Sequence, residues 1–259
     1  MRIEIDLEKS VESNASDYYN RIKKLKKKAE GAKDAVIDSK IKLKKLEKDK
    51  AKLLKELEEK EAQKIEKEWY EKFRWFISSE GFLVIGGRDA TSNEIIIKKH
   101  AEKNDVVFHT DMIGSPFFLI KTDNKKPSKA TIQEAADATV TFSKAFKLNR
   151  TTTETFMAKP EQLTKEAKAG EYVPKGGFVT KGKLEYVDNK INLAIGNYNG
   201  HIMAGPIEAI KKHCKDYLEI TQGKEKPGKI AKTIQHKIGG DLDDIIRSLP
   251  GGTFRVKKS

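Results

Sequence analysis

The sequence predicts an α+β fold in which a compact mixed domain is preceded by a long α-helical coiled-coil arm. Three observations predict it: an N-terminal heptad repeat, an abrupt change to aromatic-rich sequence at Trp69, and mixed strand-like and helix-like segments beyond that point. Charged residues make up 35% of the 259 residues, which is high for a single globule. We expect a basic arm over 1–68, a mixed domain over 69–195 and a C-terminal extension with short helices over 196–259.

The arm is predicted by a long segment without proline. Residues 11–68 contain one glycine, Gly31, and apolar or small residues recur at alternating steps of four and three. This spacing is typical of a coiled coil. The repeat runs through Val11, Ala15, Tyr18, Ile22, Leu25, Ala29, Ala32, Val36, Ser39, Leu43, Leu46, Lys50, Leu53 and Leu57. Its unbroken phase favours one continuous helix, and an antiparallel hairpin turning near Gly31 is the alternative.

The mixed domain is predicted from strand and helix signals in turn. Phe82–Ile85 fits a buried strand that ends at two glycines, and Asp89 is placed to cap a helix over about 90–102. Thr131 to Glu134 fits a capping box that opens a helix reaching about Lys147. Further strands are expected at 106–109, 117–120, 153–158, 177–181 and 191–195, and helices at 227–237 and 241–248.

The charge balance favours a polyanionic partner. The formal net charge is +13 and the pI about 9.4, which suits nucleic acid or an anionic membrane surface. The single cysteine, Cys214, excludes an internal disulfide and fits a reducing compartment. The N-terminus lacks the apolar stretch of a signal peptide, and no run approaches the ~20 apolar residues of a membrane span. We therefore expect a cytoplasmic protein without a membrane partner.

Two basic clusters are candidate phosphate contacts. The arm cluster includes Lys23, Lys24, Lys27 and Lys28, and the C-terminal cluster includes Lys229 and Lys232. A long basic helix is also often merely solvated, so charge alone leaves both interpretations open.

Aromatic residues divide into two groups. Phe73, Phe76, Phe117 and Phe118 have strand spacing and are expected in the core. Aromatic residues near basic ones are candidates for stacking on bases. These are Tyr70, Trp75, Tyr172 and Tyr198, with Arg74 beside them, and Trp75 also fits the core.

Two short motifs carry polar groups that suit recognition. Gly86-Gly87-Arg88-Asp89 joins a strand to a helix start, where backbone can approach a phosphate and Arg88 can add a charged contact. The alternative is a tight turn with a capping aspartate. His109 and Asp111 lie two residues apart, but no third metal ligand and no nucleophile accompany them. We therefore expect no metal, no cofactor and no catalytic residues, and assign the pair to RNA binding or to bonding of loop backbone.

A family resemblance adds to these arguments. The run Glu71-Lys72-Phe73-Arg74-Trp75-Phe76-Ile77-Ser78-Ser79-Glu80-Gly81, followed by Ile85–Ala90, Asn93-Glu94 and His109–Gly114, resembles the NFACT-R domain. That domain occurs with a coiled coil in ribosome quality-control proteins of the NEMF, RqcH and FbpA type. Asn14-Ala15 and Tyr18-Tyr19 before the lysine-rich helix look like the family's coiled-coil start, and Leu249–Gly252 looks like archaeal members.

The resemblance implies a function and partners. It implies an RNA-binding component of ribosome-associated quality control that contacts large-subunit rRNA, tRNA or both on stalled ribosomes. It also implies a hairpin coiled coil, so both arm geometries stay open. The sequence starts at the coiled coil, which fits a fragment, a split-gene product or a short paralogue, and a separate chain carrying the family's NFACT-N half is one candidate partner. The alternative function is a scaffold whose coiled coil recruits a protein partner, or forms a homodimer, without binding RNA.

Overall fold

The computed structural model describes residues 3–62, 66–166 and 172–257, and for residues 51–62 it describes the backbone alone. It divides into two compact units, Met1–Lys64 and Ile65–Ser259. The first is a helical arm and the second is a mixed helix and sheet domain, so the predicted fold class is confirmed.

The arm is one continuous helix, α1 (Val11–Ala62). The helix passes through Gly31 without a turn, and a Cβ added at Gly31 would meet no atom within 4 Å. Of the two predicted arm geometries, the structure therefore has the continuous helix and not the hairpin. Ser10 accepts a hydrogen bond from the Ser13 N–H at 3.2 Å, in the manner of an N-terminal cap. Seam residues such as Leu25, Leu43 and Leu46 are all more than half exposed, because nothing in the described part of the arm covers them.

The domain contains a six-stranded antiparallel sheet in the order β1-β2-β4-β3-β5-β8. The strands are β1 (Arg74–Ile77), β2 (Leu83–Gly86), β3 (Val106–Thr110), β4 (Phe118–Lys121), β5 (Thr155–Ala158) and β8 (Glu185–Tyr186). Helix α3 (Lys129–Thr141) packs on β3, β4 and β5 and covers one face of the sheet, and every residue of the central strand β4 is buried. A two-stranded ladder of β6 (Leu163–Thr164) and β7 (Val179–Thr180) lies apart from this sheet.

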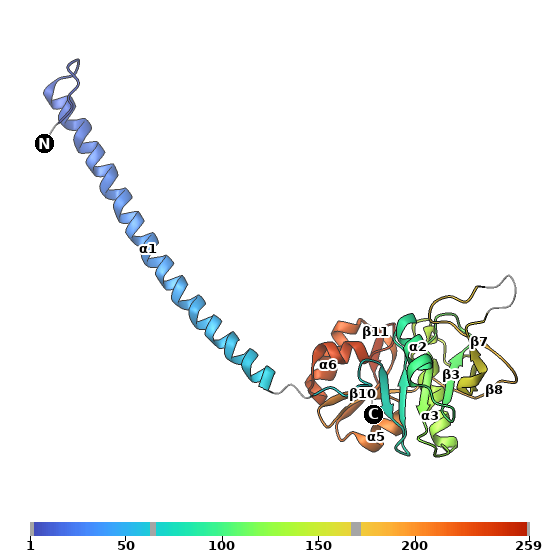
Figure 1. Ribbon diagram of the computed structural model, residues 1–259. Helices are drawn as coiled ribbons and strands as arrows, with labels where there is room; N and C mark the ends of the chain where they lie inside the picture. Colours follow the sequence, from blue (N-terminus) through green and yellow to red (C-terminus); the bar gives the residue numbers. More distant parts are fainter. Residues whose placement is uncertain (1–2, 63–65, 167–171, 258–259) are drawn as a thin grey trace. The chain divides into compact units, whose positions relative to one another are not determined.

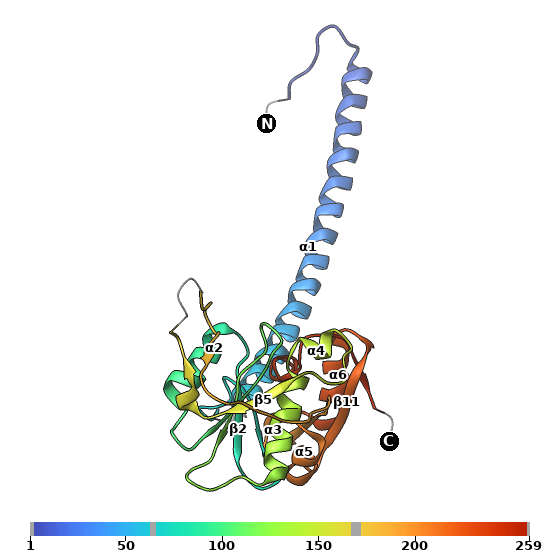
Figure 2. The same cartoon turned by 90° about the vertical axis from the view of Figure 1, so that its right-hand side faces the viewer.

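A second, four-stranded antiparallel sheet has the order β10-β9-β11-β12. Its strands are β9 (Leu193–Tyr198), β10 (His201–Gly205), β11 (Tyr217–Glu225) and β12 (Phe254–Val256). Helices α5 (Ile207–His213), α6 (Pro227–Ile238) and α7 (Leu242–Ser248) pack around it. In Figures 1 and 2 these orange-to-red elements gather on one side of the domain and the green-to-yellow elements on the other.

One hydrophobic core joins the two sheets. Gly205 of β10 lies directly against Phe76 of β1, and a Cβ added there would be 2.7 Å from the Phe76 ring. Phe73, Phe76, Phe117 and Phe118 are buried as predicted, and so is Trp75. The expected boundary between 195 and 196 falls inside β9, so residues on both sides of it share a strand.

Asp89 caps α2 (Ala90–Ile95) as predicted, and its side chain accepts a hydrogen bond from the Ser92 N–H at 2.7 Å. The helix continues as the π-helix η1 (Ile96–His100). The predicted strands near 82–85, 106–109, 117–120 and 153–158 form with small shifts, and helices α6 and α7 match the two predicted C-terminal helices.

The predicted capping box at Thr131 is wrong. Helix α3 begins at Lys129 and Ser128 caps it, while the Thr131 hydroxyl donates to the Glu80 carboxylate at 2.6 Å. The Glu134 carboxylate instead accepts from the Ser79 N–H, 2.9 Å away. The helix also stops at Thr141, and Ser143 caps a separate short helix, α4 (Lys144–Lys147), since its hydroxyl offers the backbone a local partner.

Candidate nucleic-acid interface

A cleft with a volume of about 470 Å³ lies within the domain. Its walls come from the start of β1, the β2–α2 turn, the β3–β4 turn, the corner between α3 and α4, and the segment 174–178. The lining residues are Arg74, Gly87, Arg88, Asp89, Ala90, Asn93, His109, Ile113, Gly114, Ser115, Pro116, Phe117, Phe142, Pro174, Lys175, Gly176, Gly177 and Phe178. Two of the sequence-predicted motifs, 86–89 and His109, therefore meet in one place.

The paired glycines allow the turn at the end of β2 to pack closely. A Cβ at Gly86 would lie 2.4 Å from the Phe118 ring, and one at Gly87 would lie 1.8 Å from the side-chain oxygen of Asn93. Asn93 in turn accepts a hydrogen bond from the Phe117 N–H at 3.1 Å and donates to the Ser115 carbonyl at 3.4 Å. This buried amide therefore ties α2 to the β3–β4 turn and fixes two walls of the cleft.

Arg74 lies at the start of β1, and its guanidinium is held by packing. It lies over the Phe142 ring, 4.5 Å from the ring centroid, and donates a hydrogen bond to the Leu249 carbonyl at 3.1 Å. Burial, together with a smaller contribution from repulsion by the nearby Arg88, lowers the pKa of Arg74 to about 9. The Arg74 guanidinium stays charged near pH 7, although it has lost part of its hydration.

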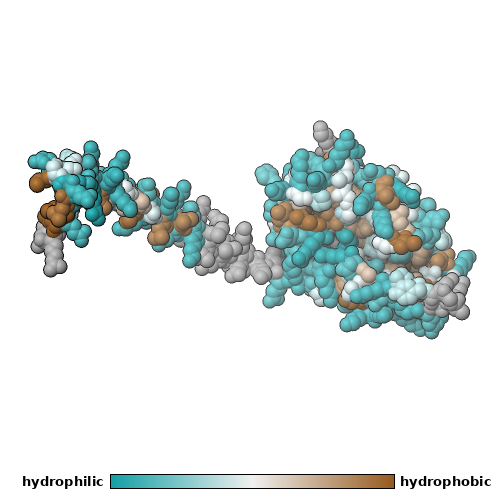
Figure 3. Space-filling model, turned by 90° about the horizontal axis from the view of Figure 1, so that it is seen from above, coloured by the Kyte–Doolittle hydropathy of each residue, from teal (hydrophilic) through white to brown (hydrophobic). Residues whose placement is uncertain are grey.

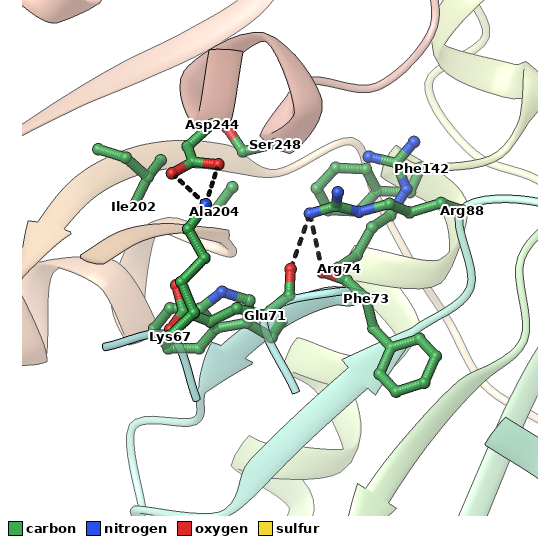
Figure 4. Close-up of a pocket in the computed structure, with 11 residues that line it drawn as sticks. Lys67, Glu71, Phe73, Arg74, Arg88, Phe142, Ile202, Ala204, Asp244 and Ser248 are labelled. Carbon is green, nitrogen blue, oxygen red and sulfur yellow. Dashed lines mark hydrogen bonds and ion pairs between the residues drawn. The ribbon is translucent and has the colours of Figure 1, made fainter. Parts of the chain in front are cut away.

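Arg88 follows the paired glycines and turns back toward the segment before β1. Its guanidinium donates to the Phe73 carbonyl at 2.9 Å and to the Glu71 carbonyl at 3.2 Å, as Figure 4 shows. Its Nε is buried and has no hydrogen-bond partner among the described residues. Burial lowers the pKa of Arg88, and repulsion from Arg247 adds to the shift.

The two arginines also line a second, much smaller cavity of about 20 Å³ (Figure 4). This space is enough for one water molecule. Asp244 lies at its edge and pairs with Lys67 at 2.6 Å, so its carboxylate is already engaged. Within the described residues, neither Arg74 nor Arg88 forms an ion pair with a carboxylate.

His109 enters the cleft as a neutral ring. It stacks on Phe117 at a centroid distance of 4.1 Å, and its Nε2 donates to the Ser115 carbonyl at 3.2 Å. Burial lowers the pKa of His109 to about 4, while the hydrogen bond to the Ser115 carbonyl and the charge of Asp111 oppose that shift. Asp111 itself is exposed, and its charge raises the pKa of Tyr186. The pair is therefore close in space, but His109 carries no charge near neutral pH and Asp111 does not line the cleft.

The wall formed by 174–178 is fastened to α2 through Glu94. Its carboxylate accepts a hydrogen bond from the Gly176 N–H at 3.2 Å and pairs with Lys165 at 2.6 Å. The bond from Lys165 lowers the pKa of Glu94 to about 2. Gly176 has a φ of +80°, and a Cβ there would collide with Ala90, so the close contact requires glycine.

The remaining predicted site residues lie on open surfaces. Lys23, Lys24, Lys27 and Lys28 are exposed on α1 and have no ion-pair partner in the described part of the chain. Figure 3 shows the arm surface as mostly hydrophilic, with separate hydrophobic side chains between. Lys229 and Lys232 are exposed on α6, where Lys229 pairs with Glu225 at 2.8 Å.

Sequence reasoning missed most of the cleft walls. Phe142, Lys175 and Phe178 line it, yet no short motif marks them, because the cleft is assembled from segments up to about a hundred residues apart. Asn93 was marked only as part of the family motif Asn93-Glu94. The adjacent pair Gly176-Gly177 was an available signal, since glycine allows close backbone approach. Of the aromatic stacking candidates, Trp75 is buried and Tyr172 is 85% exposed.

Other sites receive no support from the geometry. Among the described residues, no three His, Cys, Asp or Glu side chains gather to hold a metal ion. Cys214 is buried, which raises its thiol pKa to about 11 and makes it unreactive. In the part of the chain that is described, no helix combines the length and apolar character needed to cross a membrane.

The comparisons with known proteins agree with this arrangement. Residues 72–182, which contain the cleft walls from Arg74 to Phe178, match the family described as NFACT protein RNA binding domain. This part of the chain is thus similar to an RNA-binding domain of the NFACT type. The chain is homologous to ribosome quality-control proteins of archaea and eukaryotes, and the resemblance drawn from the motifs is confirmed.

Three relatives illustrate the homology. The archaeal Rqc2 homolog aRqcH of Methanocaldococcus jannaschii is 40% identical over 202 residues, covering 74% of this chain and 30% of that protein. The ribosome quality control complex subunit NEMF homolog of Drosophila melanogaster is 34% identical, with 71% and 18% covered. The human subunit NEMF is 38% identical, with 46% and 11% covered. The chain therefore spans less than a third of the length of these relatives.

Proposed function

We propose that this chain is an RNA-binding component of ribosome-associated quality control. It contacts large-subunit rRNA, tRNA or both on stalled ribosomes, and acts by binding rather than by catalysis in the cytoplasm. The observation that carries the proposal is the presence of two kinds of basic site in a chain homologous to ribosome quality-control proteins. One is the exposed lysine cluster of α1, and the other is the arginine-lined cleft of the NFACT-type domain.

The arm lysines supply the electrostatic part of the interaction. Six of the eight residues from 21 to 28 are basic, and the side chains of Lys23, Lys24, Lys27 and Lys28 are all exposed to solvent. Contacts of this kind release counterions from the RNA, so binding weakens steeply as salt rises. Lys229 and Lys232 on α6 add a second exposed cluster with the same character.

Co-sedimentation with purified large ribosomal subunits, together with filter binding of tRNA, tests this proposal. We expect binding in dilute buffer that falls by orders of magnitude between about 50 and 200 mM salt. Binding that hardly changes over this range, or no binding to either RNA in dilute buffer, would contradict it. A pull-down from native lysate then asks whether a chain carrying an NFACT-N domain co-purifies.

The exposed seam of α1 supports a second candidate function, which is a coiled-coil scaffold. Ile22, Leu25, Val36, Leu43 and Leu46 are each at least half exposed, although they follow the heptad repeat. A second helix laid along this seam would bury them. Light scattering of the full chain measures whether it forms a homodimer. A monomer that still binds RNA would favour the first function.

A further inference from the structure

The arginine pair in the cleft has an unusual electrostatic environment. Arg88 lies close enough to Arg74 for its charge to lower the pKa of Arg74, and both guanidinium groups are partly removed from water. Their hydrogen bonds go to the neutral carbonyls of Leu249, Phe73 and Glu71 rather than to a carboxylate. Both side chains are half-buried and form no ion pair with a carboxylate within the described residues, although the charges of Asp244 and Asp89 act on Arg88. Cations whose charge is only partly balanced favour the binding of an anion.

The rest of the lining narrows the chemistry of that anion. Lys175 adds an exposed positive charge, and Asp89 is the carboxylate of the lining, already engaged with the Ser92 N–H. The Nε of Arg88 remains a buried donor without a partner among the described residues. Phosphate suits such a site because a guanidinium can donate two parallel hydrogen bonds to its oxygens.

Part of the cleft lining is apolar. Ile113 is 86% exposed at the rim, although a side chain of its size is usually covered. Pro174 and Phe178 line the same cleft, and His109 is neutral near pH 7, so it adds no charge there. The Lys165 Nζ lies over the Phe178 ring, 4.6 Å from its centroid.

We propose that the cleft binds one unpaired nucleotide of an RNA strand, with its phosphate at Arg74 and Arg88 and its base against Ile113, Pro174 and Phe178. The volume of about 470 Å³ falls in the range of pockets that hold small ligands, roughly 300–1,000 Å³. A base that remains paired and stacked in a duplex cannot enter such a cleft, whereas an unstacked base can. This inference rests on the proposed function and names the part of the RNA that the domain recognises.

The test compares two variants of the full chain that introduce the same charge. Ile113→Asp places a carboxylate at the cleft rim, and Leu148→Asp does so at another exposed apolar side chain, outside the cleft lining. The probes are a fluorescent single-stranded hexanucleotide, a blunt duplex of the same sequence and adenosine 5′-monophosphate. Affinities come from fluorescence anisotropy for the strands and from calorimetry for the mononucleotide.

We expect the wild type to bind the single strand more tightly than the duplex. Ile113→Asp should weaken single-strand binding about tenfold, because it removes apolar contact with a base and repels the phosphate, while Leu148→Asp should leave it near the wild-type value. Binding of the mononucleotide with the same dependence on Ile113 would show that the cleft takes a free nucleotide as well. An equal response of the two variants, or no preference for the single strand, would overturn the proposal.

Charge-conserving changes at the arginines give an independent readout. Arg74→Lys and Arg88→Lys keep the positive charge but lose the bidentate geometry, so single-strand affinity should fall several-fold with thermal unfolding measured in parallel. Full affinity in folded forms of both variants would contradict the phosphate assignment. If hexanucleotide binding persists but large subunits do not co-sediment, the proposed function fails and the nucleotide site stands. If large subunits co-sediment and Ile113→Asp has no effect on single-strand binding, the nucleotide site fails and the proposed function stands.

Discussion

The arm and the cleft present positive charge in two different ways. Lys23, Lys24, Lys27 and Lys28 stand in solvent on a single helix, without a partner in the described part of the chain. Arg74 and Arg88 are fixed by carbonyls and by the Phe142 ring, and burial works against their charge. A solvated charge has little effect on the free energy of unfolding and attracts any polyanion. A charge held in a cleft loses solvation, which lowers the stability of the fold, but its fixed position can select one kind of anionic group on a ligand.

The largest expected effect separates these two roles in RNA binding. Changing the four arm lysines to glutamine removes as many phosphate contacts, so the slope of log affinity against log salt should become shallower by up to about 3.6 for duplex RNA regions. The matched control changes Lys99, Lys103, Lys125 and Lys126, which are also exposed, to glutamine. Filter binding at several salt concentrations measures both slopes. Equal slopes for the two variants would contradict the prediction that the arm lysines make more phosphate contacts than other exposed lysines.

The pH dependence of stability tests the burial of the cleft. His109 has a folded-state pKa of about 4, below its unfolded value near 6.5, so the unfolded chain binds more protons between these values. Its contribution is therefore present above pH 6.5 and lost as pH falls toward 4, by up to roughly 3 kcal/mol. Urea unfolding of the wild type and of His109→Gln is measured across this pH range. The difference between the two pH profiles gives the contribution of His109, because His100, whose pKa is also lowered, is present in both proteins. Parallel pH profiles would contradict a buried, neutral His109.

A single substitution compares a held charge with a solvated one. Arg88→Met deprives the Phe73 and Glu71 carbonyls of their charged donor, and the relief of repulsion on Arg74 offsets part of that loss. We expect a net destabilisation of about 1–2 kcal/mol in urea unfolding. Lys23→Met on the arm should change stability by less than about 0.5 kcal/mol. A cleft variant as stable as the arm variant would show that Arg88 is not part of the domain's structure.

The smallest expected effect concerns the continuity of α1. Gly31→Ala replaces the one helical glycine of the arm at a position with free space around it, and should favour the helix by about 1 kcal/mol. Circular dichroism during thermal unfolding measures the gain, with Ala32→Gly as the opposite change at the next position. A loss of helicity in Gly31→Ala would instead point to a turn at this residue.

Local signals predicted those parts of the fold that depend on neighbours in sequence. The heptad spacing predicted α1, Asp89 marked the start of α2, and apolar runs marked β2, β3 and β4. The helix start at Ser128 was missed, because Thr131 and Glu134 have the spacing of a capping box but bond to Glu80 and Ser79 instead. The strands β10 and β11 were also missed. β10 is a short apolar run, β11 has a partly polar sequence, and both pair with β9.

The candidate site divides along the same line. The sequence by itself determined the positive charge of the chain, its heptad repeat and the short motifs that hold Arg88 and His109. Only the tertiary structure decided that Arg74, Arg88 and Phe178 would share one cleft, that His109 would be neutral, and that Asp111 would lie outside it. The physical reason is that charge and periodicity belong to the chain locally, whereas burial and the meeting of distant side chains depend on packing.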